Sequence, residues 1–348
     1  MLINSCTSAE EDNVRDLPEV RNIIFMIGDG MGLAHVNAAI SVSPEPLNLE
    51  KADQTGFQTT FSADDYITDS AAGGTAMASG KKTNNGFVGL DPQGNILKSI
   101  LEIAEEHGLS TGLISTSALT HATPASFIAH DPDRDNYEAI AMDFLKTDID
   151  IFIGGGYNHF NRRADFLSLT DSLKSRSYEI DTTLSSIENS SANKIAGLIA
   201  PFQLPYRLDG RGDMLPRASR KAIEILNKNA KGFFLMIEGS QIDWAAHAND
   251  TVKMIDETLD FDSALGVVLE FARKDGHTLV LVTADHETGG VTIVGGDKEK
   301  REVVVNFSST SHTAIMVPVF AFGPGSDLFS GVMDNTSLFK KFLTLYGF

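Results

Sequence analysis

The residues that could carry chemistry in this sequence are acidic and histidine side chains that come directly after short apolar runs. They are Asp29, Glu238, Asp285 and His286, joined after a further run by His121 and Thr123. One acidic residue after a strand is most often a helix cap, but several such positions combined with histidines are typical of a metal site. Because ligands of an open α/β sheet bind at the carboxyl ends of its strands, we expect these side chains to meet there.

Asp243 and His247 form a second signal, because they lie four residues apart at the expected start of a helix. That spacing places a carboxylate and an imidazole on one helix face. Mixed histidine and carboxylate ligands favour zinc, whereas an oxygen-only set favours a hard cation such as magnesium. The zinc candidates are Asp29, Asp243, His247, Asp285, His286 and His312, enough for two ions, and the magnesium candidates are Asp29, Thr123 and Glu238. Four other histidines are expected to be ordinary hydrogen-bonded residues: His35, His107, His159 and His277.

The segment 68–77 consists mainly of small residues, with Ser70 at the expected N-terminus of a helix. Free backbone amides and the helix dipole favour an anion there. The alternative is plain helix capping by Asp69 or Ser70. No Gly-x-Ser-x-Gly motif or Ser-His-Asp order is present, so a nucleophilic Ser70 would need activation by a metal ion. Arg134 could bind two phosphate oxygens with its planar guanidinium, or pair with the neighbouring aspartates.

The elements that must position these residues alternate between strands and helices. The expected strands are 22–27, 113–115, 149–153, 233–237, 278–283 and 317–322, and the expected helices include 96–107, 219–227 and 252–274. Continuous apolar runs of this length are typical of strands that are buried on both faces. The sequence therefore predicts an α/β fold with a largely parallel central sheet and helices on both faces. We expect one domain over 21–348, with a peripheral excursion around 157–215.

Composition excludes several classes of protein. The chain has 348 residues and a net charge of −19, from 47 acidic and 28 basic side chains. That balance repels nucleic acid and anionic lipid, so an anionic substrate would need local positive charge. The single cysteine cannot form an internal disulfide. No apolar run approaches the roughly 18 to 20 residues that a membrane-spanning helix needs.

Six motifs in order resemble those of the alkaline phosphatase family. They are Gly28-Asp29-Gly30-Met31-Gly32, Thr68-Asp69-Ser70-Ala71-Ala72, Thr120-His121-Ala122-Thr123-Pro124-Ala125, Glu238-Gly239-Ser240-Gln241-Ile242-Asp243, Thr283-Ala284-Asp285-His286-Glu287 and Ser311-His312-Thr313. The resemblance covers about 21–325. It implies hydrolysis of phosphate monoesters to an alcohol and inorganic phosphate.

The resemblance also implies a role for each matching residue. Ser70 would be the serine that becomes phosphorylated and Arg134 the phosphate clamp. Asp243, His247 and His312 would hold one zinc ion, and Asp29, Asp285 and His286 the other. Asp29 would reach a third site, for magnesium, with Thr123 and Glu238. The implied reaction is a double in-line displacement, in which a phosphoserine forms and water then hydrolyses it.

His121 and Trp244 occupy positions where some relatives carry Asp and Lys, and forms with His and Trp also occur. Both would lie beside the phosphate site. An imidazole is neutral at alkaline pH and prefers softer metals, so we expect weaker magnesium binding than with an aspartate at position 121. The short interval between His286 and His312 implies a compact form of the enzyme. The family also implies a homodimer.

Two other functions remain open from the sequence. A phosphodiesterase or sulfatase of the same superfamily would share the metal ligands, although Ser70 lacks the Cys/Ser-x-Pro-x-Arg context of sulfatases. A more distant alternative is an inactive homologue that binds metal or phosphate without turnover. Ser70 flanked by Asp69 and small residues, with Arg134 available, favours the phosphomonoesterase over the first alternative. The presence of the nucleophile, the arginine and all ligands argues against the inactive homologue.

The N-terminal segment 1–20 is expected to be a disordered tether. The residues up to Cys6 resemble the end of a bacterial lipoprotein signal, followed by an acidic stretch. We therefore expect an exported protein, either periplasmic or anchored to the outer membrane by a lipid on Cys6. The alternative is an N-terminus without a targeting function.

Overall fold

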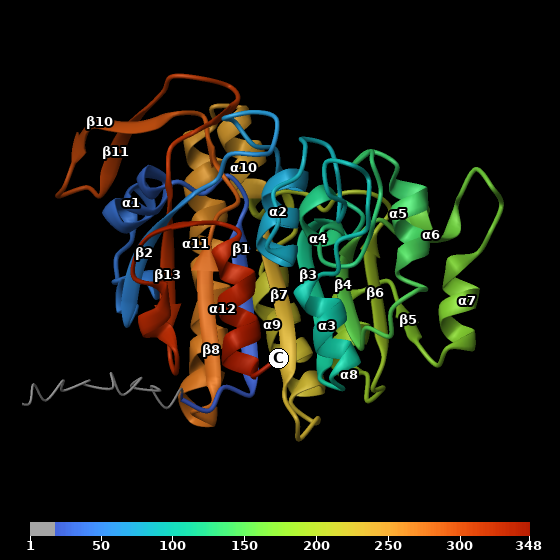
Figure 1. The fold of residues 1–348 in the computed structure, drawn as a ribbon. Helices are drawn as coiled ribbons and strands as arrows, with labels where there is room; N and C mark the ends of the chain where they lie inside the picture. The colour runs from blue at the N-terminus through green and yellow to red at the C-terminus, as the bar shows by residue number, and fades with distance from the viewer. Residues whose placement is uncertain (1–17) are drawn as a thin grey trace, which may run out of the picture.

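The centre of the molecule is a ten-stranded sheet in the order β14-β2-β13-β8-β1-β7-β3-β4-β6-β5 (Figure 1). This computed structural model describes residues 18–348, so Cys6 and most of the expected tether lie outside the described residues. The strands are β1 (Asn22–Gly28), β2 (Gln54–Thr59), β3 (Ser110–Ala118), β4 (Ile151–Gly155), β5 (Glu179–Asp181), β6 (Ile195–Ala200), β7 (Phe233–Gly239), β8 (Thr278–Thr283), β13 (Val317–Phe322) and β14 (Gly331–Asp334).

The sheet is largely parallel, as predicted. From β8 to β5 every neighbouring pair runs in the same direction, and β13 is antiparallel to both β8 and β2. The first strand lies between two late ones, with Ile23 opposite Phe234 of β7 and Leu279 of β8. The carboxyl ends of β1, β7, β8 and β3 therefore meet at one edge of the sheet.

Helices cover both faces of the sheet, because alternate strand residues point to opposite sides. Ile23, Phe25 and Ile27 of β1 belong to one apolar cluster, whereas Ile24 and Met26 belong to the other. The first cluster packs against α2 (Ser70–Ser79), α3 (Ile100–Glu106), α4 (Ala122–Ala125), α5 (Tyr137–Asp143), α6 (Tyr157–Asn161), α7 (Leu169–Ser175) and α12 (Ser337–Tyr346). The second packs against α1 (Leu33–Val42), α8 (Leu184–Asn189), α9 (Met214–Leu226), α10 (Gln241–His247) and α11 (Thr251–Asp275). The predicted α/β class is confirmed.

Two expected helices begin elsewhere than predicted. The helix expected at 96–107 starts only at Ile100, because Ser99 and Glu102 form a capping box and Ile96 makes a bridge to Leu90. The helix expected at 219–227 starts at Met214, since a proline in the first turn does not interrupt a helix. The expected peripheral stretch 157–215 contributes β5 and β6 to one edge of the central sheet.

A small subdomain was not predicted. The hairpin of β10 (Val291–Asp297) and β11 (Glu302–Phe307) projects from the upper left of the molecule in Figure 1. Below it, β9 (Glu287–Thr288) and β12 (His312–Thr313) form a two-residue antiparallel pair. This pair carries His312 and directly follows His286, so it matters for the site.

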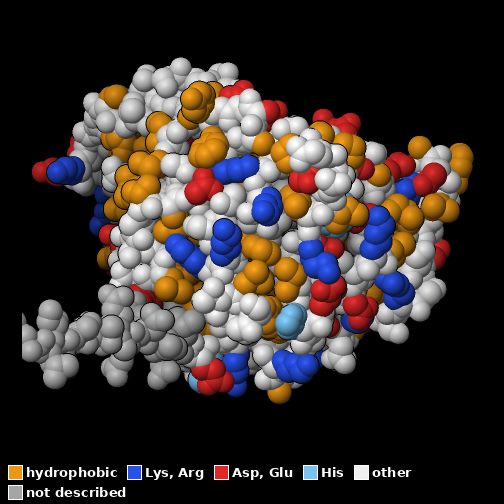
Figure 2. Space-filling view, viewed as in Figure 1, with side chains coloured by type: hydrophobic (Ala, Val, Ile, Leu, Met, Phe, Trp, Pro, Cys, Tyr) orange, Lys and Arg blue, Asp and Glu red, His pale blue; other side chains and the backbone are white. Residues whose placement is uncertain are grey.

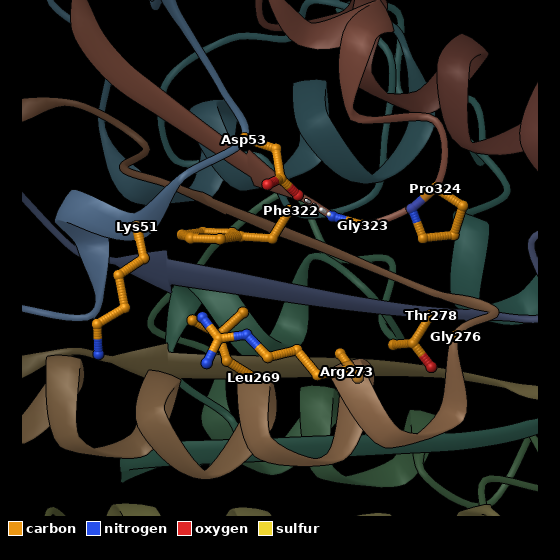
Figure 3. Close-up of a pocket in the computed structure, with 10 residues that line it drawn as sticks. Lys51, Asp53, Leu269, Arg273, Gly276, Thr278, Phe322, Gly323 and Pro324 are labelled. Carbon is orange, nitrogen blue, oxygen red and sulfur yellow. Dashed lines mark hydrogen bonds between the residues drawn. The ribbon is translucent and has the colours of Figure 1, made fainter.

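A pocket of about 270 Å³ lies at the amino-terminal end of β8, away from the edge where the site residues meet (Figure 3). Its lining combines Lys51 and Arg273 with Asp53, which accepts a hydrogen bond of 2.7 Å from the backbone N–H of Gly323. The lining contains none of the predicted site residues. Among the helices of residues 18–348, none combines the length and apolar character that crossing a membrane requires.

Candidate active site

The predicted site residues converge at the carboxyl edge of the sheet. Asp29 follows β1, and Glu238 is the last residue but one of β7. Asp285 and His286 follow β8, and Thr123 lies in α4 after β3. Gly30 makes the close approach possible: it has φ of +69°, and a Cβ there would lie 2.8 Å from Oδ1 of Asp243. The local backbone thus brings β1 against α10 without a side chain between them.

Ser70 is the first residue of α2 and is buried at the centre of this edge. Asp69 is the N-cap and accepts a hydrogen bond from the backbone N–H of Ala72. Ser70 Oγ lies 3.2 Å from Nε2 of His286. The glycines of α2 allow close packing, since a Cβ at Gly73 would come within 3.2 Å of Asp285. Ser70 therefore lies both at a capped helix start and beside a potential metal ligand, His286.

Arg134 is held beside Ser70 by Asp69. Its Nη1 donates a 2.9 Å hydrogen bond to Oδ2 of Asp69, and its backbone N–H donates to Gly86. Asp69 therefore uses one oxygen to cap α2 and the other to orient the guanidinium. The pairing with the aspartates adjacent to Arg134, considered as the alternative, is not the contact that the structure shows.

Asp243, His247 and His312 form one group of potential ligands. Nε2 of His247 lies 3.1 Å from Nε2 of His312 and 3.3 Å from Oδ2 of Asp243, and Nε2 of His312 lies 3.6 Å from Oδ1 of Asp243. Nδ1 of His247 donates to the carbonyl of Thr310, and Nδ1 of His312 donates to that of Thr68. With Nδ1 protonated in both rings, two Nε2 lone pairs face each other.

Asp29, Asp285 and His286 form a second, fully buried group. Nε2 of His286 lies 3.5 Å from Oδ1 of Asp29 and 3.3 Å from Oδ2 of Asp285. The rings of His286 and His312 stack with 3.5 Å between centroids, so the two groups adjoin. The first group is also close to His286, because one potential ligand atom each of Asp243, His286 and His312 lies within 4.8 Å of the other two.

These separations fit zinc. Two nitrogen ligands at about 2.0 to 2.1 Å from a tetrahedral zinc ion are about 3.3 Å apart. The nitrogen and oxygen atoms of both groups are separated by 3.1 to 3.6 Å. Buried polar atoms without a hydrogen-bond partner among the described residues also gather here: both oxygens of Asp29, Oδ2 of Asp285, Oε1 of Glu238, Oγ1 of Thr123 and Nδ1 of His121. Buried polar atoms are otherwise almost always paired, so these atoms fit a role as cation ligands.

A third group lies around Glu238. One potential ligand atom each of Asp29, His121 and Glu238 lies within 4.8 Å of the other two. Oε2 of Glu238 accepts a 2.5 Å hydrogen bond from Ser115, which leaves Oε1 free to face Thr123 and Asp29. The ring of His121 meets that of Trp244 edge to face, with 5.6 Å between centroids.

Burial, together with neighbouring charges and hydrogen bonds, shifts the pKa values of residues in the three groups. Burial, followed by the charge of Asp285, raises the pKa of Asp29 well above its usual range. Burial also raises the pKa of Asp285 to about 6 and that of Glu238 to about 7. Asp243 raises the pKa of His247 to about 9, whereas burial lowers that of His121 to about 3. Several carboxylates thus share one dry region, where a bound cation would favour their charged forms.

Three of the four histidines that we expected to be ordinary have non-metal partners. His107 stacks on Phe348, His159 contacts Thr120 Oγ1 at 2.7 Å, and His277 contacts the carbonyl of Glu19. His35 is fully buried, and neither ring nitrogen has a hydrogen-bond partner among the described residues.

Comparison with known families agrees with this geometry. The sequence profile of the family described as "Alkaline phosphatase" matches residues 20–306. The chain belongs to the alkaline phosphatase family. Alkaline phosphatase 4 of Bacillus subtilis is 37% identical, over 92% of this chain and 88% of its own length. Alkaline phosphatase of Escherichia coli is 32% identical, over 96% of this chain and 87% of its own length.

Solved structures of alkaline phosphatases share the fold along nearly the whole chain. The enzyme from the Antarctic bacterium TAB5 is 41% identical, with a TM-score of 0.91 over 95% of this chain and 99% of its own. A TAB5 variant in which an aspartate replaces a histidine, with magnesium in a site called M3, gives a TM-score of 0.90 at 40% identity, with the same coverage of both chains.

Several residues that shape this alkaline phosphatase site were not identified from the sequence. Ser115 supports Glu238, and Thr288 donates its hydroxyl to Oδ1 of Asp243. Asp69 was considered only as a cap and not as a partner of Arg134. The serines at the end of β3 and the threonine two residues after His286 were the available signals, because polar residues at strand ends had already marked the ligands.

Proposed function

We propose that this alkaline phosphatase hydrolyses phosphate monoesters with two zinc ions and a phosphoserine intermediate at residue 70. The observation that carries the proposal is the pair of adjoining ligand groups, with ligand separations that suit tetrahedral zinc, next to Ser70 Oγ. We assign Asp243, His247 and His312 to one ion and Asp29, Asp285 and His286 to the other.

The residues of the chain have distinct tasks in this reaction. Zinc ions, when bound, would supply Lewis acidity to the attacking and leaving oxygens of an in-line displacement. Ser70 Oγ attacks phosphorus, and its burial at the start of α2 keeps its hydroxyl in place. Arg134, oriented by Asp69, and the free amides of α2 bind the remaining phosphoryl oxygens. This local positive charge compensates for the net charge of −19.

The third group is proposed to hold magnesium with Asp29, Thr123 and Glu238. Oxygen donors suit magnesium, and the uncoordinated Oγ1 of Thr123 and Oε1 of Glu238 support the assignment. His121 faces the same group and adds a softer nitrogen donor, which would weaken magnesium binding. The TAB5 variant with an aspartate in place of a histidine has magnesium in its M3 site, which supports this view of the third group.

We further propose a homodimer formed through the face around α1. A groove of about 680 Å³ is lined by Leu33, Val36, Ile40, Ile293 and Ile315. Figure 2 shows apolar side chains gathered at the upper left, over α1 and the β10–β11 hairpin. Leu33 and Ile315 are 51% and 55% exposed, which favours a protein interface. Light scattering should give the mass of two chains, and Leu33→Glu should give one; a monomeric parent would contradict the proposal.

Residues 21–348 are proposed to act as one catalytic unit that is exported to the periplasm or the outer membrane. The family relationship supports export, and the sequence before Cys6 supports a lipid anchor. Mass spectrometry of the protein isolated from membranes would detect a lipidated Cys6. An unmodified cysteine in a cytoplasmic fraction would contradict this proposal.

The central experiment measures metal content and substrate preference together. We expect two zinc ions per chain, faster turnover of an aryl phosphate monoester than of a diester or a sulfate ester, and loss of activity on chelation. Preference for the diester or the sulfate would establish the superfamily alternative. Stoichiometric phosphate binding without turnover would establish the inactive homologue.

A further inference from the structure

Glu287 is a buried carboxylate that neither the motifs nor the ligand groups assign to the reaction. It is 3% exposed. Oε1 accepts a 2.9 Å hydrogen bond from the backbone N–H of Val291, and Oε2 accepts one of 3.2 Å from that of Gly290 and another from the hydroxyl of Thr313. The carboxylate of Glu287 therefore accepts hydrogen bonds from two backbone N–H groups and one hydroxyl.

The contact with Thr313 joins β9, which directly follows His286, to β12, which contains His312. Glu287 of β9 is opposite Thr313 of β12, and Thr288 is opposite His312. A pair of two-residue strands has little stability of its own. His286 directly precedes β9, whereas His312 belongs to β12, so each strand positions one ligand of a different zinc group.

Glu287 also packs against the loop that carries Asp29. A Cβ at Gly32 would lie 2.4 Å from Cγ of Glu287, which shows how closely the loop approaches this side chain. In the same layer the N–H of Thr288 donates to the carbonyl of Gly30, and the N–H of Gly30 donates to Asp285. Ligands from β1, β8 and β12 are thus held around one side chain.

We propose that Glu287 is a positioning residue that sets the geometry of both zinc groups through its contact with Thr313. It does not coordinate metal: its oxygens accept bonds from scaffold donors, and none of the potential ligand groups in the described chain includes it. The inference rests on the proposed two-zinc function. Its distinctive consequence is that one substitution outside the ligand set weakens both sites together.

Glu287→Gln tests the proposal with little change in side-chain size. One carboxylate oxygen becomes an NH2 group, which cannot accept a hydrogen bond from the donors around it. Zinc affinity is measured by competition with a coloured chelator, in two steps. We expect the zinc affinity of both sites to fall by about 10- to 100-fold, the range found when partners of metal ligands are removed. The visible spectrum of the cobalt-substituted protein should also change, because the coordination geometry changes.

Thr313 supplies a milder pair of variants. Thr313→Val removes the donor while keeping the shape, and Thr313→Ser keeps the donor. Valine should weaken both sites in the same direction as Glu287→Gln but less, and serine should restore parental affinity. A serine variant as weak as valine would overturn the role of this contact.

Tyr346→Phe is the control for general destabilisation. Its hydroxyl accepts from the N–H of Ile23 and donates to the carbonyl of Phe233, at the opposite end of the sheet. This variant should lower the melting temperature and leave both zinc affinities unchanged. Parental zinc affinities in Glu287→Gln, weakening of one site alone, or equal weakening in Tyr346→Phe would each overturn the proposal. A parent protein without two zinc sites would instead overturn the proposed function.

Discussion

The two ends of strands β1, β7 and β8 differ in how their buried polar side chains are hydrogen-bonded. At the amino-terminal end, the side-chain amide of Asn22 donates to Asp275 and Thr278 and accepts a 3.2 Å hydrogen bond from the N–H of Phe233. At the carboxyl end of the same strands, oxygens of Asp29, Asp285 and Glu238 are buried without hydrogen-bond partners among the described residues.

On this basis, the amino-terminal ends of these strands contribute mainly to stability, and their carboxyl ends contribute to metal binding and turnover. Paired polar groups at one end contribute to folding, whereas unpaired carboxylates at the other end cost stability until a cation compensates for them. Substitutions at the carboxyl end should therefore change turnover and metal content. Substitutions at the amino-terminal end should change the free energy of unfolding.

The largest effect is expected for Ser70→Ala, which removes the attacking oxygen. Turnover of an aryl phosphate should fall by about 1000-fold or more, about 4 kcal/mol in the activation free energy. Zinc content and melting temperature should stay at the parental values, because Ser70 is not an assigned zinc ligand. If the variant keeps more than a tenth of parental turnover, Ser70 is only part of the helix start.

His247→Ala and His312→Ala should each lose one zinc ion and retain the other. The assigned groups share no histidine, so each substitution affects one ion, and activity should fall with the lost ion. Metal analysis by mass spectrometry measures this directly. His277→Ala, at the amino-terminal end, is the matched control and should keep both ions. Loss of both ions from either variant would contradict the assignment.

Arg134→Ala should weaken inhibition by inorganic phosphate by about 10- to 150-fold. A charged hydrogen-bonding contact of this kind contributes about 1.5 to 3 kcal/mol. The inhibition constant is measured at fixed zinc, with Arg134→Lys as the variant that keeps the charge but loses the planar donor pair. Unchanged inhibition in the alanine variant would mean that Arg134 serves only as a partner of Asp69.

Asn22→Ala should lower the free energy of unfolding by about 1 to 2 kcal/mol and leave turnover unchanged. The substitution removes three hydrogen bonds and leaves the buried N–H of Phe233 without its acceptor. Denaturant unfolding of the zinc-loaded protein gives the first quantity and saturated initial rates give the second. Reduced turnover at full zinc occupancy would contradict the proposal that the amino-terminal end affects stability and not turnover.

The smallest effects are expected at His121 and Trp244. His121→Asp should make activity depend more strongly on magnesium, because a carboxylate replaces a neutral nitrogen donor. Trp244→Lys should tighten phosphate inhibition by about two- to fivefold, as a partly exposed charge contributes about 0.5 to 1 kcal/mol. Titrations with magnesium and phosphate measure both. Titration curves that match those of the parent would contradict the proposal that these two residues modulate magnesium dependence and phosphate inhibition.

The strands of the central sheet were predictable where the apolar run and the strand coincide. The bounds 278–283 and 317–322 are those of β8 and β13. β10 and β11 were missed, because most residues of this hairpin are exposed or half-buried and do not form a continuous apolar run. β9 and β12 are too short for any periodicity. Their pairing depends on tertiary contacts such as that between Glu287 and Thr313.

The ligand candidates could be proposed from the sequence because several acidic residues and histidines follow buried strands, whereas one such residue alone is most often a helix cap. The partners of those ligands were not. Asp69 and Arg134 are 65 residues apart, and Ser115 and Glu238 are 123 residues apart, so no local pattern connects them. The register of β3 against β7 brings Ser115 opposite Glu238, and register between distant parallel strands is not encoded in a short motif. Asp69 and Arg134 lie outside the strands, and tertiary packing of the loops around α2 brings them together.

The position of β1 also sets the order of events during synthesis on the ribosome. Within residues 18–348 this strand pairs with β7 and β8 alone, and Asn22 is separated from Phe233 by 211 positions. The nascent chain must therefore hold an apolar segment unpaired while most of the protein emerges. Neither proposed zinc group can be completed earlier: one needs His286 and the other His312. Both proposed zinc groups are therefore completed only after most of the chain has been synthesised.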